Sequence, residues 1–224
     1  DRVIWAACMV ACGDADGAVT GNTRRFGASL EKIKQVVEAR TGEIMFGLNL
    51  VVHKGKTIFV GDTSVHEYPS SEQLAEIAIS SARVVRLFGF DPKVAFVSHS
   101  TFGQPLTSRT KHIKNAVEIL KQKSVDFEFD GDMQPDVALN EEYKTLYPFS
   151  KLVGNANILV MPGQHSAAIS YKMMKTLGDT KVIGPLLIGL GLPIEIAPLR
   201  SSTSEILNLA SIAAYSADVI DYKK

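Results

Sequence analysis

The sequence predicts an α/β fold in which the strands are largely parallel and helices cover both faces of the sheet. Short, continuously apolar runs, typical of buried strands, alternate with amphipathic stretches of helical length. Capping signals precede several of the helical stretches, and glycines follow them. The chain has 224 residues, 46% of them hydrophobic and 21% charged. That length and composition suit one compact unit or two small lobes, each with a buried core.

The first part of the chain predicts a strand, a helix and a hairpin. We interpret residues 3–12 as a buried strand, because the segment is continuously apolar and ends in a glycine- and aspartate-rich turn. A helix is expected over 28–39. Strands 44–53 and 57–60 should form a hairpin, with Gly55 able to adopt a positive φ in the connection.

Two helices carry clear start signals. Ser70 and Gln73 fit a capping box at the start of a helix over 70–88, whose apolar residues recur at three- and four-residue spacing. Ser202 and Glu205 form a second capping box, which predicts a helix from about residue 203. Both helices are therefore expected to begin at a defined residue.

The rest of the chain alternates between strands and helices, as expected for a largely parallel sheet. The predicted strands are 94–98, 127–129, 158–161, 186–190 and 194–196. The remaining predicted helices are 107–123, 135–147 and 166–177.

Charge and cysteine content argue against several classes of partner. Lys plus Arg and Asp plus Glu both number 24, so no overall field attracts nucleic acid or a membrane surface, and we expect neither partner. No apolar stretch approaches the ~20 residues that span a bilayer.

We interpret Cys8 and Cys12 as reduced core thiols of a cytoplasmic protein, and we expect no metal site. Because the chain starts with Asp rather than Met, we expect it to be part of a longer protein.

Common catalytic motifs do not fit. The glycines at 189 and 191 run into Pro193 instead of a helix, so the dinucleotide fingerprint fails. The P-loop and the GxSxG elbow are absent. Asp14 and Asp16 precede a glycine as in a calcium loop, but Arg25 stands where the bidentate Glu belongs, which favours an ordinary turn. These motifs alone indicate an α/β domain without a recognisable catalytic set.

Six motifs follow one another in order along nearly the whole chain. They are DGAVTG (16–21), VGDT (60–63), SHSTFG (98–103), DGDMQ (130–134), NANILVMP (155–162) and IGPLLIGL (183–190). Together they resemble the phosphate acetyl/butyryl transferases. The variants VHEYP (65–69), SHS (98–100) and QLAEIA (73–78) are similar to the C-terminal domain of large bacterial NADP-dependent malic enzymes.

This resemblance implies a two-lobed, three-layer α/β/α fold of the phosphate acetyltransferase type, with the topology of the isocitrate and isopropylmalate dehydrogenases. One lobe would comprise residues 44–180. The other would combine 1–43 with 181–224, and active relatives carry a further N-terminal portion of it. The ligand would bind in the cleft between the lobes.

The resemblance also predicts that transferase chemistry has been lost. Active relatives carry a Ser-Arg-Gly-x-Ser-x-x-Asp pattern at the start of the last helix, where the Arg holds phosphate and the Asp is a base. The matching stretch, 198–205, has Pro198 for the Ser, Leu199 for the Arg and Glu205 for the Asp. Arg200 would compensate only if the register slipped by one residue. We therefore predict no catalytic residue in this domain.

A ligand pocket is predicted to remain. One group of residues follows a buried strand, where open α/β sheets bind ligands, and the other leads into a helix N-terminus, which favours anions. The predicted binding residues are Ser98, Ser100, Thr101, Arg200, Ser201 and Ser202.

By resemblance, the ligand would be acetyl-CoA, acting as an inhibitor of a malic enzyme whose NADP and Mg or Mn sites lie in an upstream domain. The domain itself would hold no cofactor and would form a homo-oligomer. Two alternatives stay open. The first is an active phosphate acetyltransferase with an altered site, and the second is a purely structural dimerisation module.

Overall fold

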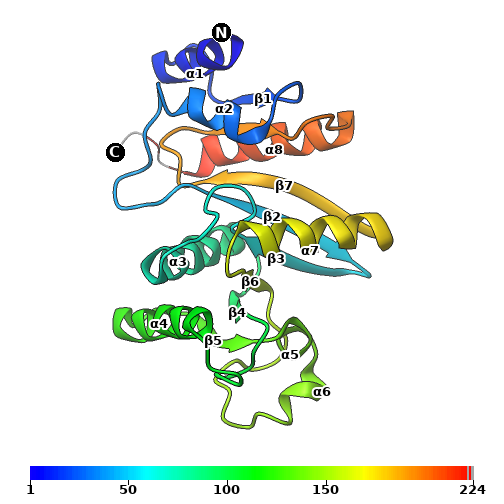
Figure 1. Cartoon of the computed structure of the whole chain (residues 1–224). Helices are drawn as coiled ribbons and strands as arrows, with labels where there is room; N and C mark the ends of the chain where they lie inside the picture. The colour runs from blue at the N-terminus through cyan, green and yellow to red at the C-terminus, as the bar shows by residue number, and fades with distance from the viewer. Residues whose placement is uncertain (221, 223–224) are drawn as a thin grey trace. The chain divides into compact units, whose positions relative to one another are not determined.

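The computed structural model describes residues 1–220 and 222 (Figure 1). Its helices are α1 (Arg2–Cys12), α2 (Phe26–Ile33), α3 (Ser71–Leu87), α4 (Ser108–Lys123), α5 (Pro135–Leu139), α6 (Glu141–Lys144), α7 (Gln164–Leu177) and α8 (Thr203–Val219). Its strands are β1 (Ala18–Gly21), β2 (Phe46–His53), β3 (Lys56–Gly61), β4 (Lys93–Val97), β5 (Glu128–Met133), β6 (Ile158–Val160), β7 (Thr180–Ile188) and β8 (Ile194–Ala197). In the described part of the chain, no helix combines the length and apolar character needed to cross a bilayer.

The backbone divides into two compact units. The first unit comprises Asp1–Asn49 and Ile183–Lys224, and the second comprises Leu50–Val182. The lobe boundaries predicted from the resemblance, after residues 43 and 180, differ from this division by a few residues. The predicted first lobe also includes residues 221, 223 and 224, which lie outside the described residues.

The predicted strand over residues 3–12 is wrong, because the segment forms helix α1. Its buried residues are Val3, Ala7 and Val10, which recur at helical spacing. Apolar side chains on the outer face hid this period: Trp5 is 72% exposed and Met9 is 38% exposed. A run that is apolar on every face looks the same in the sequence whether it is a strand or a short helix.

Asp1 and Gly13 set the two ends of helix α1. The Asp1 carboxylate accepts a hydrogen bond from Val3 N at 2.9 Å, and Gly13 closes the helix at φ 81°. The helix also changes the setting of the cysteines, since Cys8 is half-buried and Cys12 is exposed. The prediction that both are core thiols is therefore wrong for Cys12.

Other predicted elements differ in extent. The helix predicted over 135–147 is two short helices, because Asn140 leaves helical geometry at φ −128° and ψ 115°. The Asn140 side chain then accepts from Glu142 N at 3.0 Å and so caps α6. Helix α2 ends at Ile33 instead of 39, and β5 and β7 are longer than predicted. The hairpin of β2 and β3 is confirmed, with Gly55 at φ 77°.

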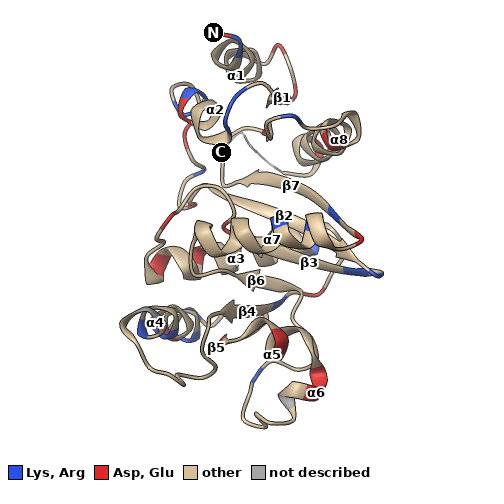
Figure 2. Cartoon of the chain, turned by 45° about the vertical axis from the view of Figure 1, so that its right-hand side comes forward, with Lys and Arg blue, Asp and Glu red and all other residues tan. Residues whose placement is uncertain are grey.

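The larger sheet has the strand order β5-β4-β6-β3-β2-β7. The neighbouring pairs β5/β4, β4/β6 and β6/β3 are parallel, as predicted. Helices cover both faces of these strands (Figures 1 and 2). On one face, Val60, Ala95 and Leu159 belong to an apolar cluster with Ala138 of α5 and Ala167 of α7. Helix α3 packs against the same strands without contributing to that cluster, as expected from the alternation of side chains along a strand.

Strand β5 is one edge of this sheet, and its acidic side chains bind the segment that follows α6. Lys151 N donates to the Asp130 carboxylate at 2.7 Å, and Val153 N donates to the Glu128 carboxylate at 2.8 Å. The Ser150 hydroxyl donates to Asp130 at 3.0 Å. Side chains of the edge strand therefore hold this segment in place, with Leu152 in the apolar cluster on one face of the sheet.

The first unit contains a two-stranded parallel pair, β1 with β8, in which Val19 lies opposite Glu195. Helix α8 packs against both strands. The capping box predicted at its start is confirmed, since Ser202 and Glu205 make both reciprocal contacts. The capping box of α3, formed by Ser70 and Gln73, is confirmed as well.

Two glycines outside the sheets provide a stability prediction. A Cβ atom added at Gly27 or at Gly13 would meet no atom within 4 Å, so only backbone preference distinguishes the two positions. Gly27 lies within helix α2, and Gly13 has φ 81°. We expect Gly27→Ala, in the first turn of α2, to stabilise the protein by about 0.5 kcal/mol and Gly13→Ala to destabilise it by about 1 kcal/mol, measured by urea unfolding. Equal effects of the two substitutions would contradict this account.

Candidate functional site

A cavity of about 660 Å³ lies at the carboxyl ends of strands β4 and β6 in the second unit. Parallel strands bring these ends to one edge of the sheet, the usual ligand position in open α/β folds. The segment between β3 and α3, the start of α4 and the start of α7 complete the wall. The lining residues are Glu67, Tyr68, Pro69, Ser70, Val97, Ser98, His99, Ser108, His112, Ile113, Pro135, Met161, Pro162, Gly163, His165, Ser166 and Ser170.

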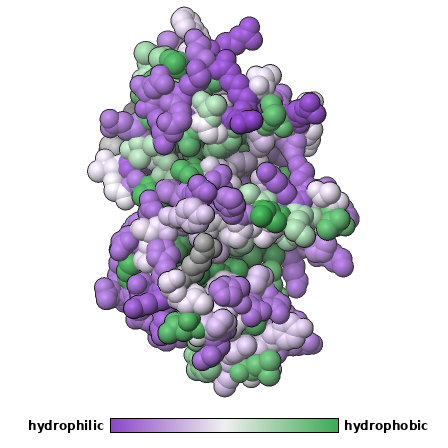
Figure 3. Space-filling view, in the orientation of Figure 1, coloured by the Kyte–Doolittle hydropathy of each residue, from purple (hydrophilic) through white to green (hydrophobic). Residues whose placement is uncertain are grey.

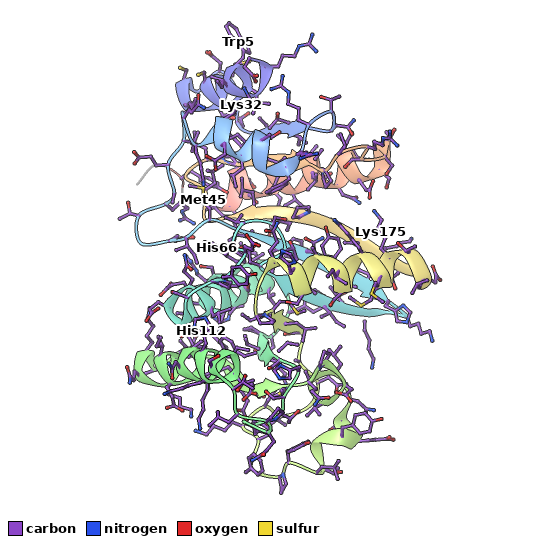
Figure 4. The ribbon with its side chains drawn as sticks, viewed as in Figure 1. Trp5, Lys32, Met45, His66, His112 and Lys175 are labelled. Atoms are coloured by element: carbon purple, nitrogen blue, oxygen red, sulfur yellow. The ribbon has the colours of Figure 1, made fainter. Side chains whose placement is uncertain are left out.

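The segment 62–69, which we call the β3–α3 loop, is organised by the buried carboxylate of Asp62. Its Oδ1 accepts from Ser64 N at 2.8 Å and from Val65 N at 3.1 Å. Its Oδ2 accepts from His66 N and from the His66 ring Nδ1, both at 2.7 Å. Four donors thus converge on one side chain and hold the loop, in which Figure 4 labels His66.

The same loop approaches the start of α7 closely. Gln164 N donates to His66 O at 3.1 Å. A Cβ atom at Gly163 would lie 2.4 Å from Glu67 O, which leaves no space for a side chain there. The cavity wall therefore depends on a glycine at this close approach of two backbone segments.

His112 joins α4 to the start of α3 (Figure 4). Its Nε2 donates to Pro69 O at 2.6 Å, and its Nδ1 lies 3.0 Å from the Ser71 hydroxyl. That hydroxyl also donates to His112 O at 2.9 Å. This role of His112 could not be predicted from the sequence, because its partners lie about forty positions away in the chain.

Of the residues predicted to bind ligand in the second unit, Ser98 lines the cavity and is 6% exposed. Ser100 and Thr101 do not line it, and both are buried. The Ser100 hydroxyl donates to the Asp132 carboxylate, and the Thr101 hydroxyl accepts from Gln134 N at 3.2 Å. The hydroxyls of Ser100 and Thr101 therefore hold the segment after β4 to the segment after β5.

The other predicted residues belong to the first unit, in the turn before α8. Arg200 has φ 63°, and its backbone N–H donates to Asn22 O at 3.0 Å. The Ser201 hydroxyl donates to Pro198 O at 2.9 Å, and Ser202 caps the helix. That this turn and Ser98 contact one ligand stays a prediction.

A second cavity, of about 570 Å³, lies in the first unit at the carboxyl ends of β1 and β8. Its lining includes Gly21, Asn22, Arg24 and Ala197. Within the described residues, the buried Oδ1 of Asn22 has no hydrogen-bond partner. Asn22 directly follows the DGAVTG motif, so the motif ends at this cavity. The cavity itself was not predicted from the sequence.

Residues 1–214 match the family described as phosphate acetyl/butaryl transferase. The chain belongs to this family. Residues 1–214 cover almost the whole described chain, so the recognition made from the six motifs is confirmed.

Several malic enzymes are similar to this member of the family. The chain is 46% identical over 217 residues to the NADP-dependent malic enzyme of Rhizobium meliloti, covering 97% of this chain and 28% of that protein. It is 33% identical over 217 residues to the NADP-dependent malic enzyme of Escherichia coli, covering 29% of that protein. The chain thus spans between a quarter and a third of the length of these relatives.

Phosphate acetyltransferases form a second group of relatives. The chain is 30% identical over 219 residues to the phosphate acetyltransferase of Bacillus subtilis, of which it covers 68%. It superposes with a TM-score of 0.91 on a phosphotransacetylase from Streptococcus pyogenes, at 30% identity, covering 97% of this chain and 68% of that one. The α/β fold of these enzymes is therefore the fold of this chain. A 4-hydroxythreonine-4-phosphate dehydrogenase from Klebsiella pneumoniae shares the fold more distantly, with a TM-score of 0.58 at 12% identity.

The turn before α8 departs from the transferase pattern expected of the family. Leu199, at the position expected to hold arginine, is 54% exposed. The Glu205 carboxylate accepts from Ser202 N at 2.7 Å and from the Ser202 hydroxyl at 2.9 Å. This carboxylate caps the helix, in agreement with the interpretation made from the sequence.

One titratable residue that the sequence analysis missed is Glu195 on β8, which is 6% exposed. Burial raises the pKa of Glu195 to about 8, and a hydrogen bond from Leu187 N at 2.9 Å opposes this shift. The signal was present, since an acidic residue stands between Ile194 and Ile196 in an apolar strand. Tyr222 is also affected: burial, followed by the Glu195 carboxylate, raises the pKa of its phenol to about 12.

Proposed function

We propose that this chain is the regulatory, non-catalytic domain of an NADP-dependent malic enzyme, and that it binds acetyl-CoA and dimerises. The whole polypeptide would convert malate and NADP to pyruvate, CO2 and NADPH in the cytoplasm. Its NADP and its Mg or Mn ion would be bound by an upstream catalytic domain. The identities of 46% and 33% to NADP-dependent malic enzymes support this assignment. We also propose that the two units share the topology of the isocitrate dehydrogenases.

The observation that carries the non-catalytic role is the exposed Leu199 at the expected arginine position. Transfer of an acyl group between a thiol and phosphate develops negative charge, which an alkyl side chain cannot stabilise. Glu205, the remaining carboxylate of the pattern, is engaged in capping α8. The cavity beside Ser98 is nevertheless open, with a volume of about 660 Å³, within the usual range for small-molecule sites. A domain that keeps a ligand pocket but lacks the side chains needed for the reaction suits a sensing role.

Regulation requires that acetyl-CoA bind one arrangement of the assembly more tightly than another. A coupling free energy of ~1–3 kcal/mol between this domain and the catalytic domain would suffice. Since acetyl-CoA reports the supply of two-carbon units, it would inhibit an enzyme that feeds that supply.

The test uses the full-length polypeptide. We expect acetyl-CoA to lower malate-dependent NADPH formation in a saturable manner, whereas acetyl phosphate at equal concentration should leave the rate unchanged. The control is the polypeptide truncated before this domain, if it keeps basal activity. An unchanged rate with acetyl-CoA at saturating concentration would reject the regulatory role.

A second candidate, an active phosphate acetyltransferase, is supported by the 30% identity to the Bacillus subtilis enzyme and by the exposed Arg200 beside Leu199. Here Arg200 would hold the phosphate. The discriminating measurement is acetyl-CoA formation from acetyl phosphate and CoA, with Arg200→Ala as the matched variant. We expect no turnover above background from either form.

A further inference from the structure

The outer face of helix α1 carries three sulfur atoms. They belong to Cys8, Met9 and Cys12, of which Met9 and Cys12 are exposed and Cys8 is half-buried. An α-helix turns by about 100° per residue, so Cys8 and Cys12 are only about 40° apart around the helix axis. Both lie on the side of α1 opposite to its buried residues, which are Val3, Ala7 and Val10.

Cys8 and Cys12 are the two cysteines of the chain, and they lie one helical turn apart. Side chains four positions apart are neighbours on a helix, with Cβ atoms about 5–6 Å from each other. A disulfide requires Cβ atoms about 3.5–4.5 Å apart, so the helix opposes closure of this pair, and both thiols are free. An ion held between two sulfur atoms spans a longer gap than an S–S bond. The pair therefore suits a bridging ion better than a disulfide.

The ligand atoms on this face select a soft ion. Thiolates and thioethers prefer Cu(I), whereas zinc takes three or four protein ligands. The described residues contain no group of three or more His, Cys, Asp or Glu that could hold a metal ion. Cu(I) is held stably by two thiolates alone, so this pair is sufficient for it. Cys12 is also the last residue of α1, where the negative end of the helix dipole favours a cation.

We propose that the outer face of α1 binds one Cu(I) ion between the thiolates of Cys8 and Cys12. The thioether of Met9, three positions before Cys12 and on a flexible side chain, would be a third and weaker ligand. Each thiol gives up its proton when the ion binds, so two protons are released per ion and the copper keeps its +1 charge. This site is in the first unit and does not depend on the proposed binding of acetyl-CoA.

The test is a competition for Cu(I) between the 224-residue chain and bicinchoninate, a chelator whose Cu(I) complex is coloured, without oxygen and with ascorbate as reductant. We expect the chain to take up one Cu(I). Cys8→Ser and Cys12→Ser should each weaken binding by at least about 100-fold, because loss of a ligand costs more than loss of a residue that only supports one. Met9→Leu should weaken it less. Met173→Leu, at an exposed position of α7, is the matched control and should leave the affinity unchanged.

Trp5 provides a second measurement, which reports where the ion binds. It is the single tryptophan of the chain, and it lies on α1 three positions before Cys8 and four before Met9 (Figure 4). We expect its fluorescence to fall in step with copper uptake, and to stay constant in the Cys8→Ser variant. Uptake should strengthen as pH rises, because binding releases protons. Thermal melting of each variant without copper verifies that it is folded.

Three outcomes would overturn the inference. The first is equal affinity of the Cys8→Ser variant and the unaltered chain for Cu(I), since the ion would then not bridge the pair. The second is uptake of one Cu(I) by two chains, because exposed Cys12 residues of two copies would then share the ion. The third is displacement of the copper by an equal concentration of Zn²⁺, which would contradict a site selected by soft ligands.

Discussion

Replacement of Asp62 by alanine is expected to lower the free energy of unfolding by about 3 kcal/mol and to abolish ligand binding in the cavity. The carboxylate is buried and accepts from three backbone N–H groups and the His66 ring. Its loss leaves these donors without their acceptor and frees the β3–α3 loop, which supplies Glu67, Tyr68 and Pro69 to the cavity wall.

Two further variants provide reference values for this change in the free energy of unfolding. Asp62→Asn keeps one acceptor oxygen in a side chain of the same shape, so its cost should lie between that of alanine and zero. Asp14→Ala, at an exposed turn position, should change stability by less than about 0.5 kcal/mol. Urea unfolding measures all three. A cost for Asp62→Ala no greater than that of Asp14→Ala would show that the loop does not depend on this carboxylate.

Glu195→Gln is expected to change the pH dependence of stability more than any surface substitution. The folded protein holds Glu195 with a pKa of about 8, against an ordinary value of 4.5. A carboxyl whose pKa is raised by folding contributes fully below pH 4.5, and that contribution is lost as pH rises toward 8. The loss amounts to up to about 5 kcal/mol, since one pKa unit corresponds to about 1.4 kcal/mol. Glutamine stays neutral and can still accept from Leu187 N, so the variant should escape the loss.

The measurement is urea unfolding of both proteins at several pH values between 4.5 and 8.5. Near pH 4.5 the two should have similar stability, and the variant should be the more stable protein at pH 8.5. Glu142→Gln, on exposed helix α6, serves as the control and should follow the unaltered chain throughout. Parallel curves for Glu195→Gln and the unaltered chain would mean that Glu195 titrates in the same way in the folded and unfolded states.

Much of the fold could be predicted from local signals. The capping boxes at Ser70 and Ser202 predicted where α3 and α8 begin, because a cap involves residues only three positions apart. The hairpin at Gly55 was predictable for the same reason. Helix α1 was not, since its exposed Trp5 and Met9 erased the helical period. The break at Asn140 depends on a side-chain cap that competes with a continuing helix.

The site was predictable to a smaller degree. Ser98 lines a cavity, as is expected at the end of a buried parallel strand, while its binding of a ligand stays a prediction. The contact between the buried side chains of Ser100 and Asp132 could not be predicted from the sequence. These residues lie 32 positions apart and meet only when β4 and β5 pair. The resemblance predicted the family, whereas the hydrogen bonds of Ser100 and Asp132 are evident only in the folded structure.

Exposed hydrophobic side chains of the second unit favour unwanted contacts with other protein molecules. Hydrophobic side chains lie over α7 in the view of Figure 3, and the exposed apolar residues of this helix include Ile169, Met173 and Leu177. A surface of this kind makes it more important that the sheet itself offers no easy template to another molecule.

The acidic residues of edge strand β5 meet that requirement. A foreign strand that paired with β5 would place its own side chains beside the carboxylates of Glu128 and Asp130. The same carboxylates that position the segment thus act as gatekeepers against edge-to-edge polymerisation. Acidic solution, which protonates carboxylates, is where a fibrillation assay should find this protection weakest.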